Sequence, residues 1–362
     1  MAAVLMFDSR AGQRPAYYRD KGHLWARRMW RSHRYFKRRL RMSRSSFNHL
    51  FALVGPHLAP DRRRSGGAAR TVPARVRLML VLYWLAHGGS QISISDGADV
   101  PSSTFSDTLR EVVDALLSSL PPPEFPSMAE EQQTLADEWL ELHSCPIVGV
   151  VGALDGTLIR ILTPPRAVKT AFNTRKCFYG VSLMAICDAK KRFLWCRSGV
   201  PGSTADSRAF KDSQWYRRQR TAGRRMLRTG VLLLADGGFA LEEWLLKPYL
   251  REQLNAARKQ YNKVLSSARA LVEQAFGLLK GRWRVLHDVV SAETELVPSI
   301  MEACARLHNY LVDLNDPWDA AVDAQATHTN EVVVDVPTGE AYKRAWAARE
   351  ALVAELWEVY GA

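Results

Sequence analysis

The stretch IVGVVGALDGT, residues 147–157, decides the fold. It is a continuous apolar run that ends in Asp155, and a second apolar run, GVLLLA at residues 230–235, ends in the same way at Asp236. Continuous apolar runs of this length are typical of strands buried on both faces of a sheet. We therefore expect both aspartates at strand tips along one edge of a buried sheet.

A third acid completes the pattern. Glu273 lies in the helical stretch ARALVEQAFGLL, residues 268–279, on or beside its apolar side. Carboxylates packed closely repel one another, and a divalent cation is the usual remedy. We interpret Asp155, Asp236 and Glu273 as catalytic metal ligands of a phosphoryl-transfer site. Together they would hold two Mg²⁺ ions ~3.5–4 Å apart. Asp155 would bridge both ions, Asp236 would hold one, and Glu273 would complete the other.

Each acid also has an ordinary explanation by itself. Asp155 and Asp236 are both followed by glycine, as in many turns. Glu273 could pair with Arg269 four residues earlier on the same helix face. The three acids together, in a basic chain, favour the site.

The charge of the chain is strongly positive and unevenly placed. The 362 residues carry a net charge of +13, and between Arg10 and Arg44 there are 13 Lys and Arg residues against a single acid, Asp20. Such a block indicates a polyanionic partner, either nucleic acid or an anionic membrane surface. A nuclear-import signal or a solvated basic arm would have the same composition.

Other features exclude several classes of protein. The longest apolar run, residues 76–86, is shorter than the ~20 residues of a membrane span, and the first residues do not have the pattern of a signal peptide. The five cysteines form no CxxC pair, which favours reduced thiols in an intracellular protein over disulfides or a zinc site.

The order of patterns along the chain predicts an α/β layer fold behind a helical region. Helical spacing begins near Leu40, with Ser43 or Ser45 as a cap, and resumes at 74–87 after an Arg/Gly-rich loop at 59–69. Strands are expected at 178–187, 192–198 and 230–235, and helices at 128–142, 207–219, 262–283 and 338–360. Prolines at 121–126 mark a boundary between the two parts.

Residues 88–120 predict a short helix, a turn near 99–101 and a second helix from Ser102 or Ser103. This arrangement is typical of a helix-turn-helix, whose second helix could reach bases or phosphates through Ser102 and Ser103. Acids at Asp107, Glu111 and Asp114 make an ordinary packing helix equally consistent.

Six short motifs occur in order along the chain. They are GALDGT at 152–157, NTRK at 173–176, PGSTADSR at 201–208, DGGF at 236–239, VEQAFG at 272–277 and LHN at 307–309. Over roughly residues 40–312 the chain thus resembles the PIF/Harbinger DDE transposases and the nuclease derived from them. It departs from the usual family pattern at Leu158, Ala205 and Gly237, and none of these changes removes a proposed metal ligand.

The resemblance implies an RNase H-like mixed sheet flanked by helices, with Mg²⁺ or Mn²⁺ at Asp155, Asp236 and Glu273. It implies cutting of DNA at terminal inverted repeats, and joining of the 3′-hydroxyl ends to target DNA. It also implies an N-terminal helix-turn-helix region and a Myb/SANT-like protein partner. We expect a homo-oligomer in the nucleus, with the cytoplasm as a second location.

The expected division of the chain has four parts. Residues 1–44 would be a basic arm, 45–126 a helical region with the helix-turn-helix, 127–312 the nuclease domain, and 313–362 a C-terminal loop and helix. Within this plan, the candidate DNA contacts are Arg38, Arg39, Ser102, Ser103, Arg175, Lys176, Arg269, Lys280 and Arg282.

Two further residues have competing interpretations. Asp206 precedes a predicted helix, so it could cap that helix or add a fourth carboxylate to the site. His308 lies in an apolar helical stretch and is interpreted as a structural histidine.

Two alternatives to a DNA-cutting function are consistent with parts of the sequence. ALDGTL at 153–158 is similar to the phosphatase signature of the haloacid dehalogenase group, but Ala153 stands where that chemistry needs a nucleophilic aspartate. The remaining alternative is a domesticated protein of transposase descent that binds DNA without cutting it.

Overall fold

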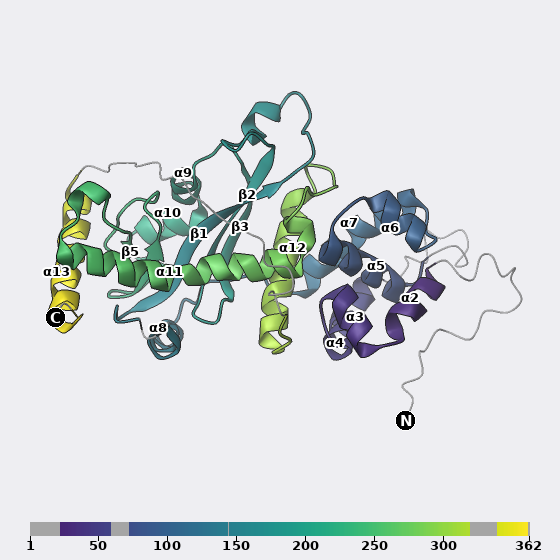
Figure 1. Ribbon diagram of the computed structural model, residues 1–362, viewed down its shortest axis with the longest axis horizontal. Helices are drawn as coiled ribbons and strands as arrows, with labels where there is room; N and C mark the ends of the chain where they lie inside the picture. The colour runs from purple at the N-terminus through teal and green to yellow at the C-terminus, as the bar shows by residue number, and fades with distance from the viewer. Residues whose placement is uncertain (1–21, 59–71, 144, 319–338, 361–362) are drawn as a thin grey trace, which may run out of the picture.

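The computed structural model describes residues 22–58, 72–143, 145–318 and 339–360. A bundle of helices from the N-terminal part lies at one end, and a sheet with helices on both faces lies at the other (Figure 1). The predicted Arg/Gly-rich loop at 59–69 falls outside the described residues, as do residues 319–338 of the loop predicted after residue 313.

The N-terminal bundle consists of α2 (His23–Trp30), α3 (His33–Leu40), α4 (Arg44–Val54), α5 (Ala74–His87), α6 (Gln91–Gly97) and α7 (Ser102–Ser119). Helix α5 has the predicted bounds, and its buried residues point in every direction around the helix axis. It is therefore the central helix, which explains why its sequence is apolar without an amphipathic period. Ser43 caps α4 as predicted, because its hydroxyl accepts a hydrogen bond from the Ser46 N–H at 3.1 Å.

The prediction of a basic arm up to residue 44 is wrong for its second half. Residues from His23 onwards form α2 and α3, and Phe36 and Leu40 are completely buried. Trp30, Phe36 and Phe47 pack edge to face, with ring centroids 4.6–5.7 Å apart. The aromatic residues between the arginines are spaced so that one side of each short helix is apolar, and that side joins the core.

Helices α6 and α7 are consecutive, and residues 98–101 connect them. The helix, turn and helix therefore lie where the sequence placed them. Ser102 and Ser103 are exposed in the first turn of α7. Contact with DNA by this pair of helices stays a prediction.

The sheet contains β1 (Val150–Arg160), β2 (Gly180–Cys187), β3 (Phe193–Pro201), β4 (Leu232–Ala235) and β5 (Leu245–Leu246) in the order β3-β2-β1-β4-β5. β2 is antiparallel to β1 and β3, whereas β4 is parallel to β1 and β5. This mixed arrangement is the one expected for an RNase H-like sheet. Every residue of β2 is buried, which accounts for its unbroken apolar sequence.

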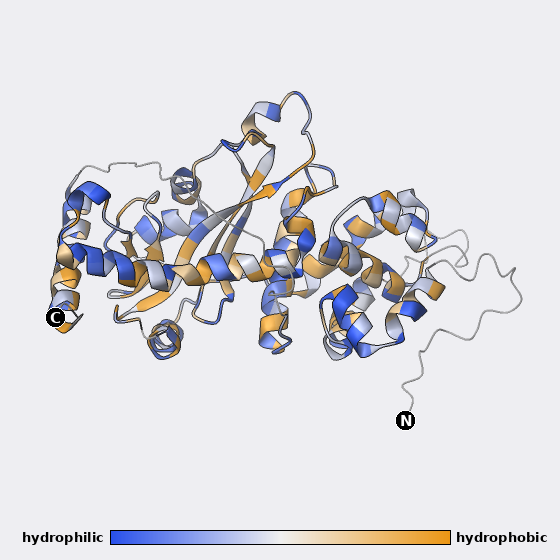
Figure 2. Ribbon diagram, in the orientation of Figure 1, coloured by the Kyte–Doolittle hydropathy of each residue, from blue (hydrophilic) through white to orange (hydrophobic). Residues whose placement is uncertain are grey.

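Helices cover the sheet on both faces. The long helix α11 (Ala256–Arg282) and α12 (Val297–Asp313) share a core with Ala153, Ile159 and the N-terminal bundle. On the other face, α9 (Asp206–Lys211) and α10 (Gln214–Arg220) share a second core with Leu154 and Met184. Figure 2 shows hydrophilic and hydrophobic residues alternating along α11, as expected for a helix with one buried side.

Two remaining helices flank these layers. Helix α8 (Ala129–His143) packs against β1, and α13 (Glu340–Tyr360) packs against α11. Arg349 of α13 is buried, with its guanidinium 3.6 Å from the ring centre of Tyr249. No helix in the described part of the chain is both long enough and apolar enough to span a membrane.

The predicted helix at 207–219 is in fact two helices. α9 ends at Lys211, and Ser213 begins α10 by accepting a hydrogen bond from the Tyr216 N–H at 3.1 Å. A serine inside a helical pattern can compete for backbone hydrogen bonds in this way. The chain turns at this point, and the turn brings Trp215 into the second core.

The carboxylate of Asp316, which follows α12, contacts the N-terminal bundle. Asp316 accepts hydrogen bonds from the Ser43 N–H at 2.7 Å and the Ser46 hydroxyl at 2.6 Å, and Lys37 Nζ lies 2.9 Å from it. These charge-assisted contacts hold the pKa of Asp316 below its usual value, although its burial acts in the opposite direction. The two parts of the molecule are thus joined by more than the covalent chain.

Candidate functional site

The parallel pairing of β1 with β4 brings the two aspartates side by side. The last pair in the register is Leu154 with Ala235, so Asp155 and Asp236 follow at the same level on neighbouring strands. The expectation that Asp155 lies at a strand tip is wrong, because β1 continues to Arg160 in antiparallel pairing with β2. Only the parallel pairing with β4 ends at this level.

Asp155 is buried, and its surroundings make its charge costly. Its side chain is 4% exposed, and its Oδ1 accepts a hydrogen bond from the Gly156 N–H at 2.8 Å. Burial, followed by the charge of Asp236, raises the pKa of Asp155 to about 7, against the opposing effects of Arg269 and the Gly156 N–H. A cation at this point would favour the ionised carboxylate.

The turn after Asp236 is built around its carboxylate. Its Oδ1 accepts a hydrogen bond from the Gly238 N–H at 2.9 Å. Lys247 is buried, and its Nζ donates to the carbonyls of Gly237 at 3.2 Å and Phe239 at 2.8 Å. Lys247 was not predicted from the sequence, although a lysine directly after the apolar pair of β5 is a visible signal for a buried cation.

Asp206 joins these two aspartates and does not cap α9. The N-cap position belongs to Ala205, and no side chain caps the helix. A Cβ placed on Gly156 would lie 2.6 Å from Asp206 Oδ1, so the carboxylate packs directly on the β1 backbone. Burial, followed by the charge of Asp236, raises the pKa of Asp206 to about 6, whereas a hydrogen bond from Ser182 lowers it. Three aspartates from β1, α9 and the end of β4 therefore influence one another.

Glu273 is engaged differently from the aspartates. Its side chain is 43% exposed on α11, and its Oε1 lies 2.6 Å from Arg269 Nη2. Arg269 Nη1 lies 3.5 Å from Asp155 Oδ2, so one guanidinium connects both acids. Among residues 22–58, 72–143, 145–318 and 339–360, no three acidic, histidine or cysteine side chains are placed to hold a metal ion. The roles of Asp155, Asp236 and Glu273 as metal ligands therefore stay predictions.

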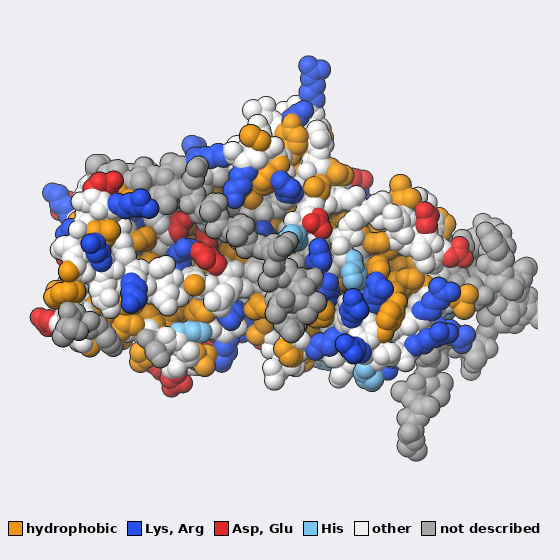
Figure 3. Space-filling view, viewed as in Figure 1, with side chains coloured by type: hydrophobic (Ala, Val, Ile, Leu, Met, Phe, Trp, Pro, Cys, Tyr) orange, Lys and Arg blue, Asp and Glu red, His pale blue; other side chains and the backbone are white. Residues whose placement is uncertain are grey.

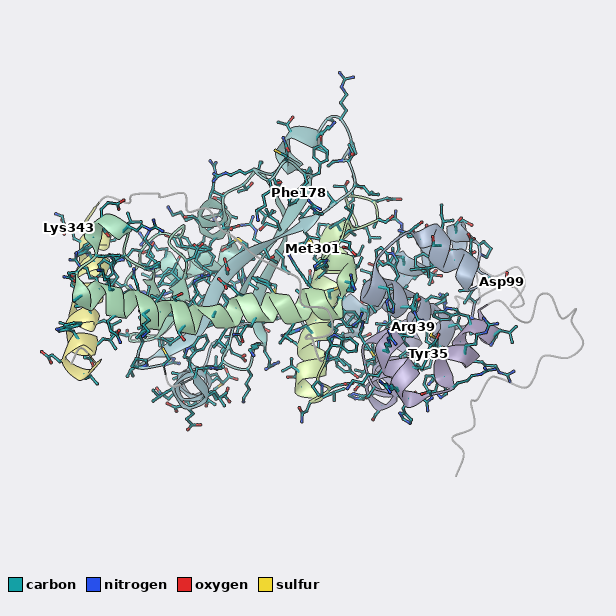
Figure 4. The ribbon with its side chains drawn as sticks, viewed as in Figure 1. Tyr35, Arg39, Asp99, Phe178, Met301 and Lys343 are labelled. Carbon is teal, nitrogen blue, oxygen red and sulfur yellow. The ribbon has the colours of Figure 1, made fainter. Side chains whose placement is uncertain are left out.

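A basic hairpin projects from the sheet beside these residues (Figure 1). The sequence from residue 156 to residue 187 contains no Asp or Glu, and its Arg and Lys residues are Arg160, Arg166, Lys169, Arg175 and Lys176. Arg175 and Lys176 are exposed, and the charge of Arg175 reaches Asp206, whose pKa it lowers. Phe178, labelled in Figure 4, lies under the guanidinium of Arg160 at 4.5 Å.

Two of the predicted DNA contacts are buried inside the protein. Lys280 and Arg282 are 7% and 5% exposed, and they donate hydrogen bonds to the carbonyls of Leu158 and Asp316. Burial, followed by the charge of Lys176, lowers the pKa of Lys280 to about 8. These two cations fasten the end of α11 to β1 and to the segment after α12, so the prediction that they face DNA is wrong for this structure.

The predicted contacts on the N-terminal helices remain at the surface. Arg38 is exposed, whereas Arg39 is half-buried beside Tyr35, with its Nη1 donating to the Tyr83 hydroxyl at 3.3 Å (Figure 4). Residues 22–58 contain no Asp or Glu. Figure 3 shows Lys and Arg side chains gathered over these helices.

The LHN motif has a structural role. The pKa of His308 is lowered to about 4 by burial, and its Nε2 donates to the Lys191 carbonyl at 2.8 Å. Asn309 accepts from the Phe193 N–H and donates to the Phe193 carbonyl, both at 2.8 Å. The interpretation of His308 as a structural histidine is confirmed, and the motif fastens α12 to the start of β3.

Comparison with known proteins agrees with this arrangement. Residues 154–309 match the family model described as DDE superfamily endonuclease. In sequence, the chain is similar to proteins of the Harbinger-type DDE transposase family. It is 26% identical over 295 residues to an ALP1-like protein of Arabidopsis thaliana, which covers 78% of this chain and 71% of the relative. It is 25% identical over 279 residues to HARBI1 of Rattus norvegicus, a candidate nuclease by its name, with 76% of each chain covered.

Among solved structures, the chain is similar to the Mos1 transposase in its paired-end complex with the left transposon end. The identity is 16%, the TM-score is 0.20, and the match covers 69% of this chain and 82% of that one. At this level the likeness adds no weight, and the relationship rests on the matches in sequence.

Proposed function

We propose that this protein is a metal-dependent DNA endonuclease that cuts at terminal inverted repeats and joins the 3′-hydroxyl ends to target DNA. The observation that carries the proposal is the pair formed by Asp155 and Asp236 where the parallel pairing of β1 and β4 ends, in a chain related to DDE nucleases. Crowded, buried carboxylates are the donors that Mg²⁺ and Mn²⁺ prefer.

The donor set suits a divalent cation, and the chain's own residues have separate tasks. Asp155 and Asp236 would hold the cations, with Glu273 as a further ligand once it leaves Arg269. Bound ions would activate the attacking water or 3′-hydroxyl and neutralise the charge that develops at phosphorus. Asp206 packs on Gly156 and would add negative charge next to the proposed metal ligands. Lys247 fixes the turn that carries Asp236.

DNA would be held by the surfaces that lack acids. The hairpin with Arg175 and Lys176 starts at the β1 strand that carries Asp155, and these two residues would hold phosphates next to the reacting bond. The basic helices α2 and α3, with Arg38 and Arg39, would bind the duplex further away. A Myb/SANT-like partner, assembly as a homo-oligomer and action in the nucleus belong to the same proposal.

One observation favours the second candidate, a DNA-binding protein that no longer cuts. Arg269 engages both Asp155 and Glu273, and the described residues do not form a ready three-residue metal cluster. A protein that had lost catalysis could keep such an arrangement permanently.

Cleavage of DNA carrying the flanking terminal repeats, with Mg²⁺ or Mn²⁺, separates the two candidates. Wild type should nick the DNA, and Asp236→Asn should lose nicking while binding DNA at least as well. Asp212→Asn is the matched control, because Asp212 is an exposed aspartate paired only loosely with Arg208 at 3.8 Å. Absence of metal-dependent nicking by wild type, also with a Myb-like partner added, would refute the nuclease.

A further inference from the structure

The guanidinium of Arg269 lies between two of the acids proposed as metal ligands. It bridges Asp155 of β1 and Glu273 of α11, at 3.5 Å and 2.6 Å. These two acids come from different elements, and no covalent constraint requires one side chain to serve both. Arg269 is 18% exposed, so its contact with Asp155 is largely shielded from water.

Arg269 offsets part of the negative charge of the carboxylates around it. Asp155 and Asp236 lie at the same level on neighbouring strands, Asp206 packs against Gly156, and Arg269 is a cation in contact with Asp155. Without a bound ion, the site therefore depends on this arginine for charge balance. A guanidinium and a divalent cation cannot both be fully coordinated by the same carboxylate oxygens.

We propose that Arg269 is an internal counter-ion that competes with the divalent cation for Asp155 and Glu273. It holds the metal-free site together, and it must release these carboxylates before they can bind metal. This inference rests on the proposed function, because it assumes that the site binds a divalent cation.

Release of Asp155 and Glu273 by Arg269 requires only a movement of the Arg269 side chain. Arg269 lies one helical turn before Glu273 on α11, so a change of rotamer moves the guanidinium without moving the helix. Release exposes a positive charge beside the two acids. The metal-free and metal-bound states would then differ in one side chain, with the backbone of β1 and α11 unchanged.

Binding of Mn²⁺ to the full chain without DNA tests the competition directly, with free Mn²⁺ measured by electron paramagnetic resonance. Arg269→Gln should bind Mn²⁺ about fivefold or more tightly than wild type, because it removes a competing ligand of the same carboxylates. Arg269→Lys keeps a positive charge there and should stay close to wild type. In EDTA, Arg269→Gln should melt at a lower temperature than wild type, and Mn²⁺ should raise its melting temperature more.

A control variant separates competition from the general loss of a positive charge. Arg208→Gln removes an exposed arginine on α9, close in sequence to Asp206. Arg208 forms a long ion pair with Asp212, at 3.8 Å. The variant should change the affinity for Mn²⁺ by less than about twofold, because exposed charges are screened.

The outcomes distinguish this inference from the proposed function. If Asp236→Asn weakens Mn²⁺ binding but Arg269→Gln binds Mn²⁺ equally or more weakly than wild type, the metal site stands and the competition is refuted. If neither wild type nor Arg269→Gln shows Mn²⁺ binding that depends on Asp236, the proposed metal site is refuted, and the inference with it. Tighter binding by Arg269→Gln alone supports the inference.

Discussion

Replacing Asp155 by asparagine should stabilise the metal-free protein, by an amount that depends on pH. Burial and the charge of Asp236 raise the pKa of this carboxyl from 3.8 to about 7. The folded protein therefore holds a proton that the unfolded chain gives up, and the free energy of unfolding falls as pH rises from about 4 to about 7. Each pKa unit corresponds to ~1.4 kcal/mol, so the full loss at pH 8 is at most about 4 kcal/mol.

Asparagine has nearly the same shape as aspartic acid and never ionises. The free energy of unfolding of Asp155→Asn should therefore not fall with pH on account of this residue. Asp155→Asn should match wild type near pH 4 and exceed its stability by roughly 2–4 kcal/mol at pH 8, after allowing for the lost attraction to Arg269. Urea unfolding in EDTA from pH 4 to pH 8, followed by tryptophan fluorescence, measures the difference. Asp107→Asn, which changes an exposed carboxylate on α7, is the control.

Two results would refute this reasoning. A stability difference between Asp155→Asn and wild type that does not change with pH would mean that the buried charge is not its cause. A less stable Asp155→Asn at pH 8 would mean that the carboxylate contributes more through its contacts than it costs through burial. Divalent cations should narrow the difference, because only wild type offers the ionised ligand.

Three other substitutions test the surroundings of the site. Gly156→Ala would place a Cβ 2.6 Å from Asp206 Oδ1 and should lower the rate of nicking at least about tenfold. Asn309→Asp loses the donor to the buried Phe193 carbonyl and should lower the free energy of unfolding by about 3 kcal/mol in urea. Arg349→Met removes the cation of α13 that stacks on the ring of Tyr249. It should increase hydrogen exchange throughout α13.

Each substitution has a matched control. Gly277→Ala adds a methyl group on α11 with nothing within 4 Å, so nicking should persist. Gln133→Ala removes an exposed side-chain hydrogen bond on α8, and Arg344→Met changes a 65% exposed arginine of α13. Normal nicking by Gly156→Ala, full stability of Asn309→Asp, or unchanged exchange in Arg349→Met would each contradict the role given to that contact.

The sequence predicted the elements whose burial on every side leaves a continuous apolar run. β2 and α5 are buried on every side, so their apolar runs marked them closely. β5 is two residues long and is too short to show a period. The break between α9 and α10 depends on the Ser213 cap, which the helical pattern of the surrounding residues concealed.

Within the site, the sequence located the acids but not their partners. The neighbouring positions of Asp155 and Asp236 follow from parallel pairing, which strand-end motifs can indicate. The place of Asp206 against Gly156 depends on how α9 packs across the sheet, and no local pattern records that. The burial of Lys280 could have been found, because it lies four residues after Phe276, on the apolar side of α11.

The Asp316 junction has a consequence for synthesis of the chain. The Ser43 N–H and the carboxylate that accepts its hydrogen bond are separated by 273 positions. At ~5–20 residues per second, the ribosome needs roughly 15–50 seconds between these two residues. The first helices therefore emerge long before α12 and Asp316 can pack against them. The N-terminal bundle is therefore among the first parts synthesised, but its contacts with α12 and Asp316 are among the last to form. During that interval the surface that later contacts α12 is open to binding by a chaperone.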